Sequence, residues 1–192
     1  HIRRVSVSSL LRTQFEWFYP LSEQHQIQFK IDAPKELYWN TDSVYFKKIL
    51  ANLISNAFKY TEDGGTVRIS LHEEENFLVL KVYNTGKGIE EADMQNIFDR
   101  YRILGTMDND DNRQNTARNG LGLFICHSLV QSLGGKIDIE SEVGQYAEFT
   151  VTLPFGIVEE SSDDTIDEDI PVSLPSPNTD IQKPQISHTA QK

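Results

Sequence analysis

Apolar residues recur every three or four positions in three long stretches of the chain, and this spacing predicts amphipathic helices. Serine residues before the first stretch and Asp42 or Ser43 before the second are suitable N-caps, and Gly134-Gly135 ends the third. The three predicted helices cover residues 10–18, ending near Pro20 or one turn later, then the stretch from residue 43 to the turn at 63–65, and residues 121–133.

Alternating apolar and polar residues predict six strands, at residues 27–31, 37–39, 66–71, 77–83, 136–140 and 147–153. The last four form two predicted hairpins. Between the hairpins we expect a short helix over residues 91–98 and a polar loop over residues 101–119. This order predicts an α+β fold, in which a mixed, mostly antiparallel sheet is covered on one face by the three long helices.

Composition divides the chain into a domain and a tail. The 192 residues are 38% hydrophobic and 24% charged, which suits one globular domain with some excess length. Residues 157–192 hold eight acidic residues against two lysines, four prolines and no periodic apolar pattern. We therefore expect an ordered domain over residues 1–156 and an acidic disordered tail or linker over residues 157–192.

Charge and cysteine content exclude some classes of function. The net charge of −11 argues against nucleic acid as the main partner, because phosphate-backbone binding needs a basic surface. The single cysteine, Cys126, lies in an apolar helical stretch and is expected to be a core residue. The sequence has neither an apolar run long enough to cross a membrane nor a signal-peptide pattern, so we expect a cytosolic chain without membrane contact.

The second predicted helix carries an unusual polar stripe. Asn52, Asn56 and Lys59 fall on one narrow face at helical spacing. Amide oxygens can ligate a hard cation such as Mg²⁺, and lysine supplies a positive charge for phosphate. An ordinary solvated helix face would have the same pattern, so the stripe alone leaves both interpretations open.

Two glycine motifs add candidate binding elements. Asn84-Thr85-Gly86-Lys87-Gly88-Ile89 directly follows a strand, and its glycines would let the backbone turn sharply beside a flat ligand. Strand-to-helix turns use Gly and Asn routinely, so this motif alone is also ambiguous. Asn119-Gly120-Leu121-Gly122-Leu123 is expected to open the third helix, where exposed N–H groups favour phosphate.

The motifs occur in an order that resembles the ATP-binding domain of sensor histidine kinases. An Asn-rich helix is followed by a glycine turn, by the aromatic pair Phe98 and Tyr101, and by a glycine-opened helix ending at Gly134-Gly135. The resemblance covers roughly residues 5–154 and continues through the whole of residues 120–154. Around residues 84–88 and 98–101 the chain looks most similar to hybrid two-component sensors of the Bacteroidetes type.

The resemblance implies a fold, a ligand and a set of site residues. It implies a Bergerat-type α/β sandwich with residues 101–119 as an ATP lid, binding ATP and Mg²⁺ with Asn56 as the metal ligand. Asn52 would lie near the phosphates, Lys59 would reach a phosphate and Tyr60 would pack on the nucleotide. The implied nucleotide-binding residues are Asn52, Asn56, Lys59, Tyr60, Asn84, Gly86, Gly88, Ile89, Tyr101, Arg118, Gly120, Leu121, Gly122 and Leu123.

Two positions depart from the family pattern. Asn84 stands where an aspartate usually accepts a hydrogen bond from the adenine amino group, so charge assistance worth about 1–2 kcal/mol is lost. Arg118 replaces a glycine that is common two residues before Gly120, where it would stiffen the lid or add a phosphate contact.

No histidine in the chain has the features of a phosphoacceptor. His1 begins the chain, with no helix before it and no acidic neighbour after it, and His127 is expected to be a surface residue on the third helix. His25, His72 and His188 lie in a turn, at a strand end and in the tail, where we expect no catalytic role.

The leading hypothesis is the ATP-binding part of a histidine kinase, which presents the γ-phosphate to a histidine on a separate dimerisation domain. Its further partner would be a response regulator or receiver domain, and it could be the cytosolic part of a membrane-anchored sensor. One alternative is a nucleotide-binding pseudokinase or regulatory module without phosphotransfer. Another is a different ATPase of the same superfamily, such as an anti-sigma-factor kinase, a mismatch-repair ATPase or a chaperone.

Overall fold

The computed structural model describes residues 1–99 and 113–157, with only the backbone given for residues 113–120. Its helices are α1 (Val7–Gln24), α2 (Ser43–Tyr60), α3 (Glu91–Met94) and α4 (Arg113–Ser132). Its strands are β1 (Arg3–Ser6), β2 (Gln28–Asp32), β3 (Tyr38–Thr41), β4 (Thr66–Glu74), β5 (Phe77–Thr85), β6 (Lys136–Glu142) and β7 (Tyr146–Pro154).

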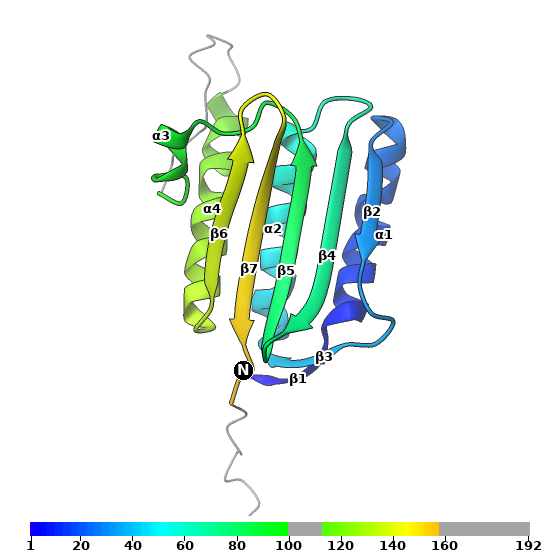
Figure 1. Cartoon of the computed structure of the whole chain (residues 1–192), viewed down its shortest axis with the longest axis vertical. Coiled ribbons are helices and arrows are strands. Elements are labelled where there is room, and N and C mark those ends of the chain that lie inside the picture. Colours follow the sequence, from blue (N-terminus) through cyan, green and yellow to red (C-terminus); the bar gives the residue numbers. More distant parts are fainter. Residues whose placement is uncertain (100–112, 158–192) are drawn as a thin grey trace, which may run out of the picture. The chain divides into compact units, whose positions relative to one another are not determined.

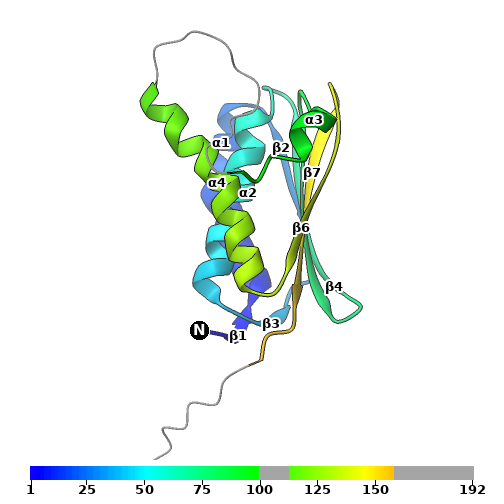
Figure 2. The same cartoon turned by 90° about the vertical axis from the view of Figure 1, so that its left-hand side faces the viewer.

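The main sheet has five strands in the order β2-β4-β5-β7-β6 (Figure 1). β2 runs parallel to β4, and the other three pairs are antiparallel. α1, α2 and α4 cover one face of this sheet (Figure 2), and α2 lies between the other two (Figure 1). The predicted α+β fold with a mixed sheet and helices on one face is therefore confirmed. The predicted domain boundary at residue 156 stays a prediction, because almost all of the tail lies outside the described residues.

The core lies between the sheet and the helices. Alternate residues of β5 and β7 point toward α2, and Leu78, Leu80 and Val151 are each almost completely buried. Burying one such side chain stabilises the fold by about 1.5–3 kcal/mol. α2 contributes the matching apolar face, on which Phe46, Leu50 and Leu53 are fully buried, so its polar stripe must lie to the side of this contact.

Two strands lie outside the main sheet. β1 pairs antiparallel with β3, and this two-stranded sheet was not predicted, because β1 is short and mostly exposed. Trp39 of β3 anchors the pair, since its Nε1 donates a hydrogen bond to the Pro154 carbonyl at 3.0 Å. The last described residues of the chain continue beside β3, where the Gly156 N–H donates to the Asn40 carbonyl at 2.9 Å.

Several predicted element ends are wrong. α4 begins at Arg113, eight residues before its predicted start at residue 121, because a glycine weakens a helix by about 1 kcal/mol without ending it. α3 ends at Met94 rather than residue 98, and the chain continues in turns with hydrogen bonds from the Asn96 and Asp99 N–H groups three residues back. β4 and β5 extend two or three residues beyond their predicted ends.

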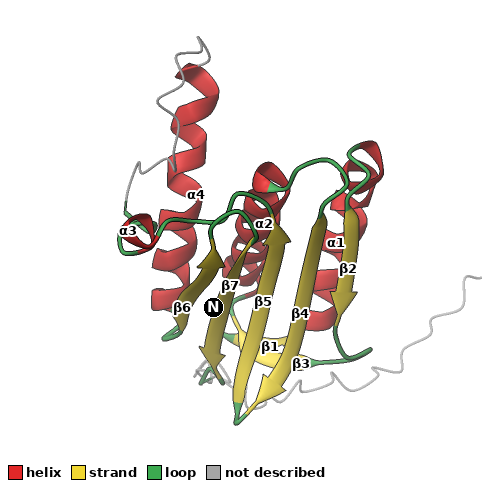
Figure 3. Cartoon of the chain, turned by 45° about the horizontal axis from the view of Figure 1, so that its top comes forward, coloured by secondary structure: helices red, strands yellow, loops and turns green. Residues whose placement is uncertain are grey.

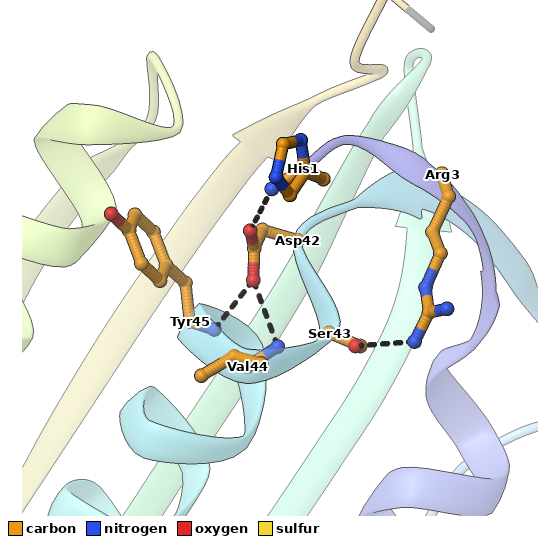
Figure 4. Close-up of polar contacts among 6 residues, drawn as sticks. All are labelled: His1, Arg3, Asp42, Ser43, Val44 and Tyr45. Carbon is orange, nitrogen blue, oxygen red and sulfur yellow. Dashed lines mark hydrogen bonds and ion pairs between the residues drawn. The ribbon is translucent and has the colours of Figure 1, made fainter.

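Asp42 caps α2, as one of the two predicted alternatives proposed (Figure 4). Its Oδ1 accepts hydrogen bonds from the N–H groups of Val44 at 2.8 Å and Tyr45 at 3.0 Å. Its Oδ2 contacts the His1 ammonium group. Burial alone would raise the pKa of the Asp42 carboxyl, but these hydrogen bonds and the nearby positive charge outweigh it and lower the pKa.

Asp42→Ala is expected to lower the free energy of unfolding by about 1 kcal/mol, because two N–H groups of α2 lose their acceptor. Since the folded pKa is lowered, this contribution is complete above the unfolded pKa and disappears as the pH falls through the folded pKa. Urea unfolding at pH 7 and pH 3 measures both effects, with Asp32→Ala, an exposed aspartate of β2, as the control. An equal deficit at both pH values would contradict the capping role.

Candidate functional site

A cavity of about 300 Å³ opens at one end of the sheet, between α2, the loop after β5 and the β6–β7 hairpin. Figure 3 views the molecule from this end. The volume is at the lower end of the range for small-molecule sites, about 300–1,000 Å³. The lining residues are Asn56, Tyr60, Asn84, Lys87, Gly88, Ile89, Glu90, Asp93, Val143, Ala147 and Phe149. Five of these, Asn56, Tyr60, Asn84, Gly88 and Ile89, belong to the predicted site.

Asn84 is the buried polar residue of the cavity, with a side chain only 4% exposed. It lies near the end of β5, between Val67 of β4 and Ala147 of β7. Its Nδ2 donates a hydrogen bond to the Thr85 carbonyl at 3.0 Å, which fixes the orientation of the amide. Among the described residues no donor bonds its Oδ1, so the amide oxygen is the atom available to a ligand.

The loop after β5 depends on its two glycines. Gly88 has φ +66°, and a Cβ added there would lie 2.3 Å from the Glu142 carbonyl oxygen. Gly86 has φ +154°, and its added Cβ would lie 2.3 Å from the Tyr60 carbonyl oxygen. Only glycine fits at these contacts. The predicted sharp turn is therefore confirmed, although Gly86 lines a neighbouring open hollow rather than the cavity itself.

The three residues of the polar stripe on α2 lie in three different environments. Asn56 lines the cavity together with Tyr60. Lys59 lines a different hollow, beside α1, and its Nζ lies 4.9 Å from the centre of the Tyr60 ring. Asn52 does not line the cavity, and its Nδ2 donates to the Lys48 carbonyl at 2.9 Å within α2. The structure thus brings only Asn56 of the stripe into the cavity.

The glycines of α4 do not form a helix N-terminus. Gly120 and Gly122 lie within α4, so the predicted helix start at residue 121 is wrong, and the contacts of both glycines with phosphate stay predictions. A Cβ on Gly122 would lie 3.2 Å from Asn52 Oδ1. The glycine therefore allows α4 to pack closely against α2. Leu123 is a core residue and Leu121 is half-buried, and neither lines the cavity.

Part of the predicted lid cannot be placed. Tyr101 and residues 100–112 lie outside the described residues. Arg118 and Gly120 are described only as backbone of α4. Their predicted contacts with phosphate stay predictions.

The sequence pattern missed six cavity residues. Ala147 and Phe149 were predicted only as strand positions, and the register that sets Ala147 opposite Asn84 could not be derived from alternation. Lys87, Glu90 and Asp93 bring charge to the rim, and Val143 comes from the turn of the β6–β7 hairpin. Lys87 could have been suspected, because it lies between the two motif glycines.

The internal histidines that the structure describes contact neighbouring side chains, and the cysteine lies in the core. His127 was predicted to be a surface residue, but it is half-buried and its ring stacks on Phe98 at a centroid distance of 5.1 Å, with the planes inclined by 14°. His25 bonds Asp63 at 2.8 Å, and His72 lies 3.7 Å from Glu74. Cys126 is fully buried, as predicted, and burial raises the pKa of its thiol to about 12.

A family model described as histidine kinase-, DNA gyrase B- and HSP90-like ATPase matches residues 41–157, which include the cavity residues. The chain belongs to this ATPase family. The predicted resemblance to the ATP-binding domain of sensor histidine kinases is confirmed.

The named relatives of this ATPase domain include a sensor protein and the catalytic domain of a histidine kinase. The sensor protein SrrB of Staphylococcus aureus is 36% identical over 120 residues, which cover 62% of this chain and 20% of SrrB. The catalytic domain of histidine kinase ThkA matches with a TM-score of 0.69 and 24% identity, over 81% of this chain and 96% of that one. Full-length ShkA in complex with AMPPNP matches with a TM-score of 0.69 and 25% identity, over 82% and 32%.

The chain matches only part of the length of some of these relatives. The chain spans about a fifth of the length of SrrB, so its similarity concerns one domain of a longer protein. ThkA has also been solved in complex with the response regulator protein TrrA, and that kinase chain matches with a TM-score of 0.67 and 22% identity, over 81% of this chain and 42% of that one. Similarity to Bacteroidetes-type sensors stays a prediction. None of the described helices is long and apolar enough to span a membrane.

Proposed function

We propose that this domain binds Mg-ATP and presents the γ-phosphate to a histidine on a separate dimerisation domain, as the catalytic part of a two-component sensor kinase. The observation that carries the proposal is the cavity, in which Asn84 and Asn56 line one space beside a loop that only glycine can form. ShkA, which has this fold, has been solved with AMPPNP, and this supports a nucleotide as the ligand.

The cavity suits the base and ribose of ATP. Asn84 offers an amide oxygen as acceptor, and the 6-amino group of adenine is a donor of the required kind. Phe149 and Ile89 supply apolar walls for the flat ring, and Gly88 allows the backbone to approach closely. Tyr60 of α2 lines another side of the cavity, and the Lys59 ammonium group lies over the Tyr60 ring.

Asn56 fits the role of a magnesium ligand. Its side-chain amide oxygen is a hard ligand, and the described residues contain no cluster of His, Cys, Asp or Glu that could hold a metal ion. At such a site the Asn56 amide would supply one oxygen ligand, and the ATP phosphates and water would supply the remaining ligands. Bound Mg²⁺ would neutralise charge on the phosphates. Asn52, Lys59, Gly120, Gly122 and Arg118 are proposed to contact the phosphates when the nucleotide is bound.

The acceptor histidine is proposed to lie on another domain. Each internal histidine in the described part of the chain contacts a carboxylate or stacks on a ring, and none of them lines the cavity. The complex of ThkA with TrrA supports a response regulator as a further partner. Transfer therefore needs a dimerisation domain supplied with this one.

Calorimetric titration of the chain with ATP, with and without Mg²⁺, tests the first part of the proposal. We expect saturable binding that Mg²⁺ strengthens. Absence of saturable heat under both conditions would contradict nucleotide binding.

Incubation with radiolabelled ATP and a purified dimerisation domain tests the second part of the proposal, the transfer of phosphate to a histidine. Binding without labelled histidine would favour a regulatory, non-transferring domain.

Asn84→Asp is expected to tighten ATP binding by about tenfold, because a carboxylate makes a stronger, charge-assisted hydrogen bond with the adenine amino group. GTP, which presents a carbonyl oxygen at that position, should lose affinity in the same variant. Titration with both nucleotides measures the change. Asn76→Asp, in the β4–β5 turn, is the matched control and should bind ATP like the unmodified chain. Equal strengthening of ATP and GTP binding would contradict the proposed contact.

A further inference from the structure

The loop after β5 is fastened to the β6–β7 hairpin by three hydrogen bonds. The Gly86 N–H donates to the Gln145 carbonyl at 3.1 Å, and the Gly144 N–H donates to the Lys87 carbonyl at 2.7 Å. The Ile89 N–H donates instead to the Ser141 hydroxyl at 2.8 Å. The third bond alone involves a side chain, so it is the one that a substitution can remove without altering the backbone.

The Ser141 hydroxyl has a fixed orientation. It donates its own hydrogen to the Tyr146 carbonyl at 2.6 Å, so its lone pairs are directed to other donors. Ser141 lies in β6 opposite Ala147 of β7, on the half-buried side of the strand. Through these two bonds the hydroxyl links the loop to β7, whose Ala147 and Phe149 line the cavity.

This contact lies next to the part of the cavity that holds Asn84. Ala147 pairs with Ser141 on one side and with Asn84 on the other, so the three residues are at one level of the sheet. Ile89, whose N–H donates to the Ser141 hydroxyl, is 7% exposed and lines the cavity. A shift at Ile89 would therefore change the width of the cavity beside Asn84.

We propose that Ser141 is a positioning residue for the nucleotide site, which holds the Ile89 end of the glycine loop against the proposed adenine pocket. The inference rests on the proposed function of the cavity. The two backbone bonds at Gly86 and Lys87 keep the first half of the loop in place when the hydroxyl is absent. The Ile89 N–H would then have no acceptor in a part-buried position, and the loop would turn it toward water.

Ser141→Ala removes one oxygen atom and tests this role. Calorimetry should show ATP and ADP binding weakened by about tenfold each, as the loss of one positioning hydrogen bond would produce. The factor should be the same for both nucleotides, because the loop lines the base end of the cavity. Ser141→Thr keeps the hydroxyl and should restore binding.

Ser132→Ala is the matched control. Ser132 is an exposed serine of α4 whose hydroxyl donates to the Ser128 carbonyl at 2.9 Å, away from the cavity lining. This variant should bind both nucleotides like the unmodified chain. Hydrogen exchange gives a second measurement, in which Ser141→Ala should speed exchange of the Ile89 amide and leave the Gly86 amide unchanged.

Unchanged binding in Ser141→Ala would overturn the inference while the proposed function stands. Weak binding in Ser141→Thr, or an unchanged exchange rate of the Ile89 amide in Ser141→Ala, would do the same. A loss confined to ATP would also overturn it, because that would place the effect at the phosphates. Failure of the proposed function is distinguishable, since the unmodified chain would then bind neither nucleotide.

Discussion

Gly88→Ala is expected to lower the free energy of unfolding by about 2–4 kcal/mol and to abolish measurable nucleotide binding. Two costs combine at this position. The backbone has φ +66°, where a side chain is strained, and the new Cβ would lie 2.3 Å from the Glu142 carbonyl oxygen. The atoms nearest to this Cβ belong to the main chain of Glu142 and Val143, so they cannot move aside without displacing the β6–β7 hairpin from the cavity.

Gly64→Ala separates the two costs. Gly64 has φ +80°, but an added Cβ there meets nothing within 4 Å. This variant should lose only about 1 kcal/mol and bind ATP normally. Urea unfolding and calorimetry on both variants provide the comparison. Equal destabilisation of the two would show that the loop–hairpin contact at Gly88 contributes nothing beyond backbone strain.

The sheet and helices could be predicted because their signals are local. Alternation in residues 66–71 and 77–83 and helical spacing through α2 identified the elements that build the core. Two alternating stretches in succession identified each hairpin. β1 has no such signal, because one buried valine among three polar residues gives no period to recognise. Its place depends on pairing with β3, which is a tertiary contact.

The site was predicted in its parts but not in its assembly. A helical wheel places Asn52, Asn56 and Lys59 on one face, yet it gives the direction of Cα–Cβ bonds and not what each side chain meets. The close approach of Gly122 to Asn52 and the place of Lys59 in a hollow beside α1 depend on neighbouring elements. Spacing along α2 cannot contain that information.

Local sequence patterns also could not predict that the β6–β7 hairpin lines the cavity. Ser141 was an ordinary strand residue in the sequence, and its bond to the Ile89 N–H joins positions 52 residues apart. The start of α4 shows the opposite error, since two glycines suggested that a helix begins where the chain is already helical. Glycine has two uses, sharp turning and close packing, and the sequence does not distinguish them.

Asn56→Ala is expected to weaken Mg-ATP binding by about 100-fold, through loss of the proposed metal ligand. Titrations in Mg²⁺ and in EDTA separate this effect from loss of a simple cavity contact. In Mg²⁺ the variant should bind far more weakly than the unmodified chain. In EDTA the two should differ little, because no metal is present to be ligated.

Ser55→Ala is the control for this substitution. Ser55 is the exposed neighbour on α2, and its hydroxyl donates to the Asn52 carbonyl at 3.1 Å within the helix. Both substitutions place a strong helix former in α2, so neither should destabilise the helix. If Asn56→Ala weakened binding equally in Mg²⁺ and in EDTA, Asn56 would be a contact of the nucleotide itself, and the metal would have to be held by other residues.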